Sequence, residues 1–251
     1  LKRRPGQVTD DTGMSLARGE AILANGGSVM PLACAEAFDA WMRRKPVDIG
    51  NTVRRNLLTF RRTGVPVALA SDHDAGNGAA MRVLPVALAT FGQSEAAVRA
   101  AGQAQAHVTH NNVVSDAVCQ FLTLAVQDLL RGGSLEEMLG KHLGALLAAH
   151  PELSFRDRPR RENPSGWVVE TLQAVLQGLL GSDGFEDSLV DVVNRGGDAD
   201  TTGAIAGMLA GALYGPQAIP KRWLQALDPG VASRCREQAR ALLPLTACQV
   251  A

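Results

Sequence analysis

Two short acidic clusters near opposite ends of the chain contain the residue types that could do chemistry. In each cluster two aspartates stand beside a threonine, so carboxylate and hydroxyl oxygens are concentrated within a few positions. Oxygen atoms of this kind are the ligands that Mg²⁺ and Mn²⁺ prefer in proteins. If the fold brings the two clusters together, they offer enough ligands for two divalent ions. The candidate metal ligands are Thr9, Asp10, Asp11, Asp198, Asp200 and Thr201.

Helix capping is the alternative explanation for both clusters, because each stands where a helix is predicted to begin. Asp and Thr side chains accept hydrogen bonds from first-turn amides, and carboxylates favour the positive end of a helix dipole. Capping accounts for one carboxylate per helix more easily than for two, so metal binding is the favoured interpretation of Asp198 and Asp200. For Asp10 and Asp11 taken alone, capping is the simpler interpretation, although one can cap while the other binds metal.

Residues 74–78 form a second kind of polar segment, in which two glycines flank Asn77. Glycine permits positive φ and lets backbone amides approach an anion or a sugar closely. Asp74 at the start of this segment is a candidate for acid–base or electrostatic catalysis at a sugar carbon. An ordinary loop before a helix is the alternative.

Three further positions are candidate substrate contacts, each with a structural alternative. His110 precedes a predicted helix whose positive end lowers the pKa of the ring and keeps it neutral; helix capping is an equally simple role. Asp48 is a polar tip of a glycine-containing turn, where it could instead cap the next helix. Trp167 follows the arginine-rich residues 156–161 and could stack on a base while an arginine meets a phosphate. A place at the edge of the core is the commoner role for a tryptophan.

The composition supports a sizeable core, because 46% of the 251 residues are hydrophobic. Lys plus Arg equals Asp plus Glu at 25 each, so a nucleic-acid partner held by bulk charge is not expected. No apolar run is expected to span a membrane. The cysteines form no CxxC pair and are expected to be reduced thiols in a cytoplasmic protein. They are Cys34, Cys119, Cys235 and Cys248.

Helical patterns follow one another along the whole chain, whereas alternating strand patterns are scarce. The sequence therefore predicts an all-α fold with a single domain over residues 1–251. Glycine recurs at every fourth position at Gly203, Gly207 and Gly211, which predicts that another helix approaches this face closely. Helices are expected over 12–24, 31–44, 51–62, 79–91, 95–107, 112–130, 135–150, 166–180, 185–194, 201–214 and 231–243.

These segments, in this order, resemble the ADP-ribosylglycohydrolase family. The resemblance runs over almost the whole chain and depends on residues 7–12, 45–52, 74–82, 109–111 and 196–203. It implies a compact bundle of orthogonal helices with a binuclear Mg²⁺ or Mn²⁺ centre, which removes ADP-ribose from a modified protein side chain. In the branch that this chain resembles, the bond is N-glycosidic and the side chain is arginine, with a nitrogenase iron protein as one candidate substrate. An O-linked or small-molecule substrate, or an inactive relative that binds ADP-ribose, stays open.

The resemblance also implies roles for particular residues. The ions hold the ribose hydroxyls and an ordered water, and Asp74 and Asp11 are the expected catalytic carboxylates. Family members carry an additional N-terminal helical segment, so this chain is expected to be an N-terminally incomplete, monomeric domain. The expected substrate contacts are Asn77, Gly78, His110, Asp48 and Trp167.

Overall fold

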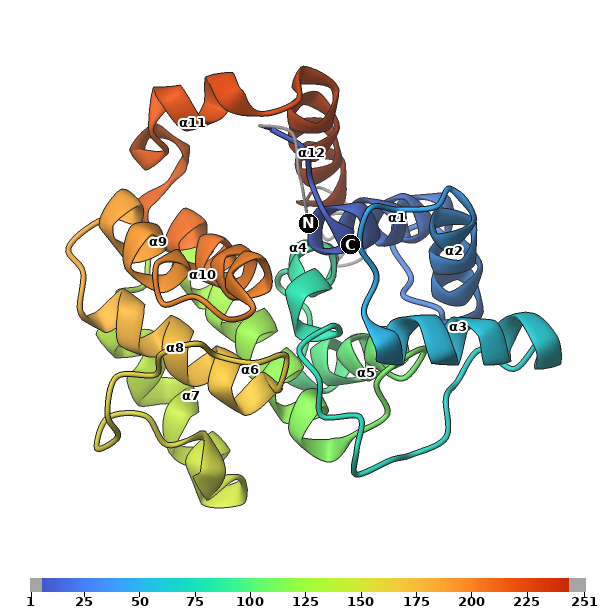
Figure 1. Ribbon diagram of the computed structural model, residues 1–251, viewed down its shortest axis with the longest axis horizontal. Coiled ribbons are helices and arrows are strands. Elements are labelled where there is room, and N and C mark those ends of the chain that lie inside the picture. The colour runs from blue at the N-terminus through green and yellow to red at the C-terminus, as the bar shows by residue number, and fades with distance from the viewer. Residues whose placement is uncertain (1–5, 244–251) are drawn as a thin grey trace.

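The computed structural model describes residues 6–243, which form helices joined mostly by short loops (Figure 1). Over this range no strand occurs, and the one β-bridge joins Gly76 to Trp167. The all-α prediction is therefore confirmed, while residues 1–5 and 244–251, with Cys248, lie outside the description. The helices are α1 (Asp10–Ala24), α2 (Pro31–Arg43), α3 (Asn51–Thr63), η1 (Ala80–Arg82), α4 (Leu84–Ala89), α5 (Glu95–Ala106), α6 (Val113–Leu130), α7 (Leu135–Ala149), η2 (Pro151–Leu153), α8 (Val168–Leu180), α9 (Phe185–Val193), α10 (Ala199–Tyr214), η3 (Pro216–Ala218), α11 (Lys221–Ala226) and α12 (Pro229–Leu242).

One large apolar core joins the two ends of the chain. Figure 1 shows α1 to α3 on one side and α8 to α10 on the other, with α4, α5 and α6 between them. Buried side chains from both sides meet in this core, for example Phe38 of α2, Leu122 of α6 and Leu209 of α10. Because α1 and α10 both pack into it, their N-terminal ends can lie close together although they are far apart in sequence.

The central helix α6 corrects one sequence prediction. By length and composition Val113–Leu130 is apolar enough to cross a membrane, contrary to the expectation that no run would be. However, 56% of this helix is buried inside the structure. A helix that is apolar on most sides is typical of a core helix as well as of a membrane span, and the core position accounts for its composition here.

Two local predictions were only partly right. The single helix expected over 79–91 is split at Val83 into η1 and α4, because Pro85 has no N–H to donate and its ring clashes with the preceding turn. Close approach to α10 is confirmed at Gly203, where an added Cβ would lie 2.9 Å from Val193 Cγ2. At Gly211 an added Cβ would meet nothing within 4 Å, so that end of the glycine face is not in close contact.

Candidate metal and substrate site

The N-terminal ends of α1 and α10 open onto the same cavity, which has a volume of about 270 Å³. It therefore brings together acidic side chains from the two ends of the chain. Loops before α3 and η1, and the segment before α8, complete its walls. Its lining residues include Asp10, Asp48, Gly76, Asn77, Gly78, His110, Gly166, Asp198, Asp200 and Thr201.

Neither acidic cluster acts as a side-chain cap. Thr9 is at the N-cap of α1 and Asp198 at the N-cap of α10, yet neither side chain accepts a hydrogen bond from a backbone amide of its helix. Thr9 Oγ1 instead donates to Asp11 Oδ2 over 2.8 Å. Asp48 does not cap α3, because Gly50 holds that position and Asp48 Oδ1 accepts from the Ile49 amide. The capping alternative therefore does not explain these carboxylates.

Burial and mutual repulsion make the cluster a poor place for uncompensated negative charge. Burial raises the pKa of Asp10, and the neighbouring carboxylates of Asp48 and Asp200 raise it further. Burial also raises the pKa of Asp198, with Asp200 again adding to it. Carboxylates that raise one another's pKa in this way are stabilised by a cation placed among them.

Asp11 is the most deeply placed member of the first cluster. Its side chain is only 4% exposed, and its buried Oδ1 has no hydrogen-bond partner among the described residues. Burial, with contributions from Asp10 and Asp200, raises its pKa to about 7. Asp11 is not among the residues that line the first cavity; it lines a neighbouring one together with Thr12 and Ser15.

The donor set fits a divalent cation in chemical type. It consists of hard oxygen atoms, and an unpartnered carboxylate oxygen is buried beside them. Over residues 6–243, however, no three acidic, histidine or cysteine side chains converge closely enough to enclose an ion without further ligands or movement. The sequence therefore found ligands of suitable type, while the side chains are not closed around one point.

Asn77 fastens the glycine-containing loop to the second acidic cluster. Its Nδ2 donates to Asp198 Oδ2 over 2.7 Å and to Thr171 Oγ1 over 3.0 Å, and its backbone amide donates to Gly166 O. Gly76 and Gly78 make room for His110, since a Cβ at Gly78 would lie 2.8 Å from the ring carbon Cε1. The loop is thus closely fitted between the acidic residues and the histidine.

His110 is buried and neutral, as the sequence predicted, but for a different reason. Burial, with smaller contributions from the guanidinium groups of Arg82 and Arg55, lowers its pKa to about 3. The helix that was expected to act on the ring, α6, begins only at Val113 and is capped by Asn112. Desolvation and two arginines therefore replace the helix end as the cause.

Asp74 is placed differently from the other predicted site residues. It is buried and does not line the cavity. One oxygen forms an ion pair with Arg55 and the other lies 3.5 Å from Asn56 Nδ2. Neither Arg55 nor Asn56 was among the predicted site residues, although both lie on the helix that was expected over 51–62. These contacts support the loop that follows Asp74, and its catalytic role stays a prediction.

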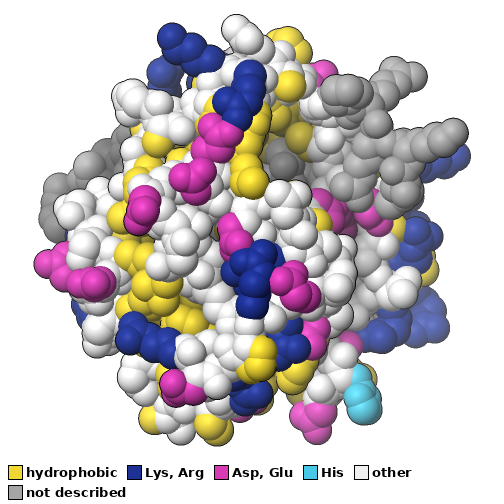
Figure 2. Space-filling view, turned by 60° about the vertical axis from the view of Figure 1, so that its left-hand side comes forward, with side chains coloured by type: hydrophobic (Ala, Val, Ile, Leu, Met, Phe, Trp, Pro, Cys, Tyr) yellow, Lys and Arg dark blue, Asp and Glu magenta, His cyan; other side chains and the backbone are white. Residues whose placement is uncertain are grey.

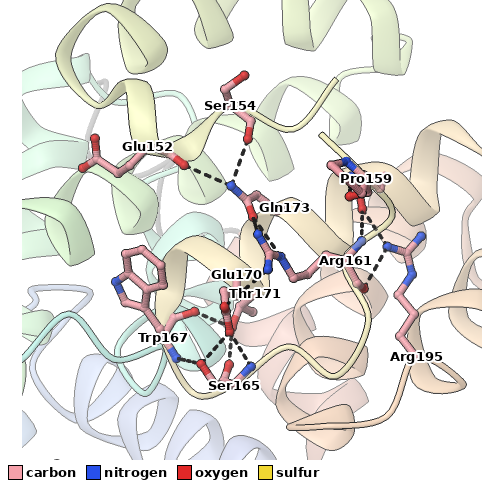
Figure 3. A network of polar contacts seen from close by, with 11 residues as sticks. Glu152, Ser154, Pro159, Arg161, Ser165, Trp167, Glu170, Thr171, Gln173 and Arg195 are labelled. Atoms are coloured by element: carbon pink, nitrogen blue, oxygen red, sulfur yellow. Dashed lines mark hydrogen bonds and ion pairs between the residues drawn. The ribbon is translucent and has the colours of Figure 1, made fainter. Parts of the chain in front are cut away.

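Trp167 lies at the edge of the site and is held by a network of polar contacts behind it (Figure 3). The residue is 45% exposed, so it is not part of the buried core, and its stacking role stays a prediction. The next residue, Val168, donates its amide to Ala75 O, which joins this segment to the glycine loop. Ser165 donates to Glu170, and Arg161 donates to Gln173. The arginine-rich loop is therefore tied to α8.

The turn before the second cluster requires glycine. Gly197 has φ +61°, and a Cβ there would lie 2.2 Å from Pro164 O. This close passage allows the Asp198 amide to donate to Pro164 O over 2.7 Å. Gly197 therefore lets the loop before α8 cross directly over the start of α10, which fixes the position of Asp198.

Several known proteins resemble this chain over most of its length. The ADP-ribosylglycohydrolase family description matches residues 1–249. ADP-ribosyl-[dinitrogen reductase] glycohydrolase of Rhodospirillum rubrum is 44% identical over 245 residues, which are 98% of this chain and 82% of the relative. ADP-ribosylarginine hydrolase Tri1 of Serratia proteamaculans (strain 568) is 32% identical over 90% of this chain, but the match spans only 65% of that relative.

A solved structure agrees with these relatives. The "ADP-ribosylglycohydrolase-related protein complex" superposes with a TM-score of 0.84 and 33% identity, and the match covers 96% of this chain and 83% of the other. The sequence match and the all-α architecture therefore point to the same protein class. This chain belongs to the ADP-ribosylglycohydrolase family, and it is a hydrolase.

Proposed function

We propose that the chain hydrolyses the N-glycosidic bond between ADP-ribose and an arginine side chain of a modified protein. The observation that carries this proposal is the meeting of Asp10 with Asp198 and Asp200 at one cavity, from opposite ends of the chain. Two relatives support the substrate class, since one is named for dinitrogen reductase and the other for ADP-ribosylarginine. An iron protein of nitrogenase is the modified protein that we propose, which would place the chain in the regulation of nitrogen fixation.

Two Mg²⁺ or Mn²⁺ ions are the proposed cofactors. Bound ions would balance the carboxylate charge and act as Lewis acids toward oxygen atoms of the substrate or of water. Asp11 is the ligand with the clearest need of a partner, because its buried Oδ1 has none among the described residues. The proposed ligands are Thr9, Asp10, Asp11, Asp198, Asp200 and Thr201.

The remaining site residues are proposed to bind and orient the ADP-ribosyl group. Positive charge that develops at the anomeric carbon is favoured by nearby carboxylates, for which Asp11 and Asp74 stay the candidates. The ion pair with Arg55 makes support of the glycine loop the role that the contacts of Asp74 favour. Asn77, Gly78, His110 and Asp48 line the cavity where the ribose and diphosphate would lie. The exposed indole of Trp167 offers a face on which adenine can stack.

The location and the assembly state of the protein are also part of the proposal. The described cysteines Cys34, Cys119 and Cys235 are free thiols, which is typical of a reducing compartment, so we propose that the protein is cytoplasmic. The monomeric state expected from the sequence stays a proposal. On the face shown in Figure 2, basic and acidic side chains are interspersed without a broad area of either sign. The modified protein and the product ADP-ribose are therefore the proposed partners, and nucleic acid is not.

A hydrolysis assay tests the proposal directly. The chain is incubated with an arginine-linked and a serine-linked ADP-ribosyl peptide, with Mn²⁺ or with EDTA, and released ADP-ribose is measured. We expect release from the arginine linkage in Mn²⁺ only, and its loss in Asp200→Ala. The matched control is Asp187→Ala, an exposed acid on α9, which should keep the activity. Release from the serine linkage alone, or full activity of Asp200→Ala, would overturn the proposal.

A further inference from the structure

A chain of hydrogen bonds between buried side chains runs behind the cavity and ends at His110. It joins Gln105 at the end of α5, Arg82 of η1, Thr109 and His110, and none of these side chains is more than 2% exposed. Of these four residues only His110 lines the cavity. Buried polar groups are costly unless every partner is satisfied, so the order of donors and acceptors along the chain can be worked out.

Arg82 sets the direction of the chain. Its Nε donates to Gln105 Oε1 over 3.1 Å, and its Nη2 donates to Gln105 O over 3.1 Å and to Thr109 Oγ1 over 2.7 Å. Gln105 Nε2 donates in turn to Ala79 O, which fixes the orientation of the amide. Because a guanidinium has donors and no acceptor, Thr109 Oγ1 must accept from Arg82.

The hydroxyl of Thr109 then determines where the proton of His110 lies. A hydroxyl has one hydrogen, and with Arg82 as a donor to Oγ1 that hydrogen is available to His110 Nδ1, which lies 2.8 Å away. Oγ1 has a second lone pair and could accept from a protonated Nδ1, but the hydroxyl hydrogen would then have no acceptor among the described residues. The arrangement that satisfies both groups has Nδ1 as the acceptor and therefore without a proton. Burial keeps the pKa of the ring near 3, so the imidazole is neutral at pH 7 and its single proton is on Nε2.

Nε2 is on the side of the ring that faces the glycine loop and the cavity. A Cβ on Gly76 would lie 3.1 Å from Nε2, and His110 is one of the lining residues. The carboxylate oxygens at the other walls are acceptors, whereas Nε2–H is a donor. The oxygen atoms of a sugar or a diphosphate accept hydrogen bonds. Those that do not bind a cation require a donor such as Nε2–H.

We propose that Arg82 and Thr109 are positioning residues, which hold His110 as the Nε2–H tautomer so that it donates a hydrogen bond to an oxygen of the ADP-ribosyl group. The identity of the ligand depends on the proposed function, but the tautomer does not. Gln105 completes the arrangement by holding Arg82. Neither Arg82 nor Thr109 lines the cavity, so each acts through His110.

Nitrogen-15 NMR of the histidine rings tests the tautomer without any substrate. In the wild-type chain at pH 7 we expect a non-protonated Nδ1 and a protonated Nε2 for His110. Thr109→Val removes the hydroxyl hydrogen and should change the Nδ1 shift, whereas Thr109→Ser should restore it. The matched control is Thr123→Val, a buried threonine whose hydroxyl donates to Cys119 O instead. A wild-type ring protonated on Nδ1, or wild-type shifts in Thr109→Val, would overturn the proposal.

Kinetics with the arginine-linked peptide test the substrate contact. We expect Thr109→Val to raise KM roughly tenfold, which corresponds to the loss of one hydrogen bond to a charged oxygen. The change in kcat should be much smaller. If Thr109→Val changes the tautomer of His110 and leaves KM unchanged, the proposed hydrogen bond from His110 to ADP-ribose is wrong. If the chain releases no ADP-ribose at all, the proposed function fails, while the NMR result still decides the tautomer.

Discussion

The protonation of Asp11 gives a quantitative test of the site in the absence of metal. Its carboxyl is buried, one oxygen has no partner among the described residues, and its pKa is raised from 3.8 to about 7. Asp11→Asn removes this titration while keeping the size of the side chain and an oxygen that can accept from Thr9. The effect of the substitution on stability should therefore depend on pH in a defined way.

The sign follows from comparing the folded and unfolded states. Because the folded pKa of Asp11 is above the unfolded value, its contribution to stability is fully present below pH 3.8 and is lost as the pH rises through 7. Each pH unit in this window corresponds to about 1.36 kcal/mol. Ionised Asp11 therefore lowers the stability of the metal-free protein by about 4 kcal/mol above pH 7.

Denaturant unfolding in EDTA at several pH values measures this effect. The difference in free energy of unfolding, Asp11→Asn minus wild type, should grow by about 1.4 kcal/mol per pH unit between pH 4 and 7 and then level off. Asp187→Asn, at an exposed acid, serves as the control and should show no such slope. A difference for Asp11→Asn that is constant with pH would refute the reasoning.

Bound metal should restore the stability that the protein loses when Asp11 ionises. Mn²⁺ at a hundred times its dissociation constant adds about 2.7 kcal/mol to a protein that binds it only when folded. We expect this gain in the wild type at pH 8 and a clearly smaller gain in Asp11→Asn. If Mn²⁺ stabilises the wild type and Asp11→Asn equally, Asp11 is not a ligand of the metal site.

Other substitutions test the packing that holds the site. Gly197→Ala should lower Tm, because φ at this position is +61° and the added Cβ would clash with Pro164 O. Gly211→Ala should instead add about 1 kcal/mol to the free energy of unfolding, because an added Cβ meets nothing within 4 Å there. Thermal melts in which both substitutions have the same effect would contradict this geometry. Arg18→Met should raise the free energy of unfolding by about 1–3 kcal/mol, because the guanidinium is fully buried and its three nitrogens have no hydrogen-bond partner among the described residues, only the Phe38 ring. Urea unfolding measures this, and a destabilised Arg18→Met would show that the arginine is compensated in the folded state.

The acidic clusters and the glycine loop could be predicted from sequence because their chemistry is concentrated in short segments. Carboxylates beside a threonine, or glycines around an amide, indicate a candidate chemistry without knowledge of the fold. Long-range partners carry no such signal. The ion pair of Arg55 with Asp74 joins different elements, and it moves Asp74 from the cavity wall to the support of the loop.

Buried arginines were missed for a related reason. Charged residues are usually exposed, so Arg18 and Arg82 attracted no interpretation in the sequence. A signal for Arg18 was nevertheless present, because Met14, Arg18 and Ile22 are four residues apart and lie on the same buried face of α1. The burial of Arg82 depends on hydrogen bonds to Gln105 and Thr109. These residues belong to another segment, which only the tertiary structure brings close to Arg82.

Titration of Mn²⁺ into the metal-free chain by calorimetry tests the central claim most directly, namely that carboxylates from the two ends of the chain bind cations together. We predict two ions per wild-type chain, the same number in Asp187→Ala, and the loss of at least one ion in Asp200→Ala with unchanged circular dichroism. No uptake by the wild type, or wild-type stoichiometry in Asp200→Ala, would contradict the account.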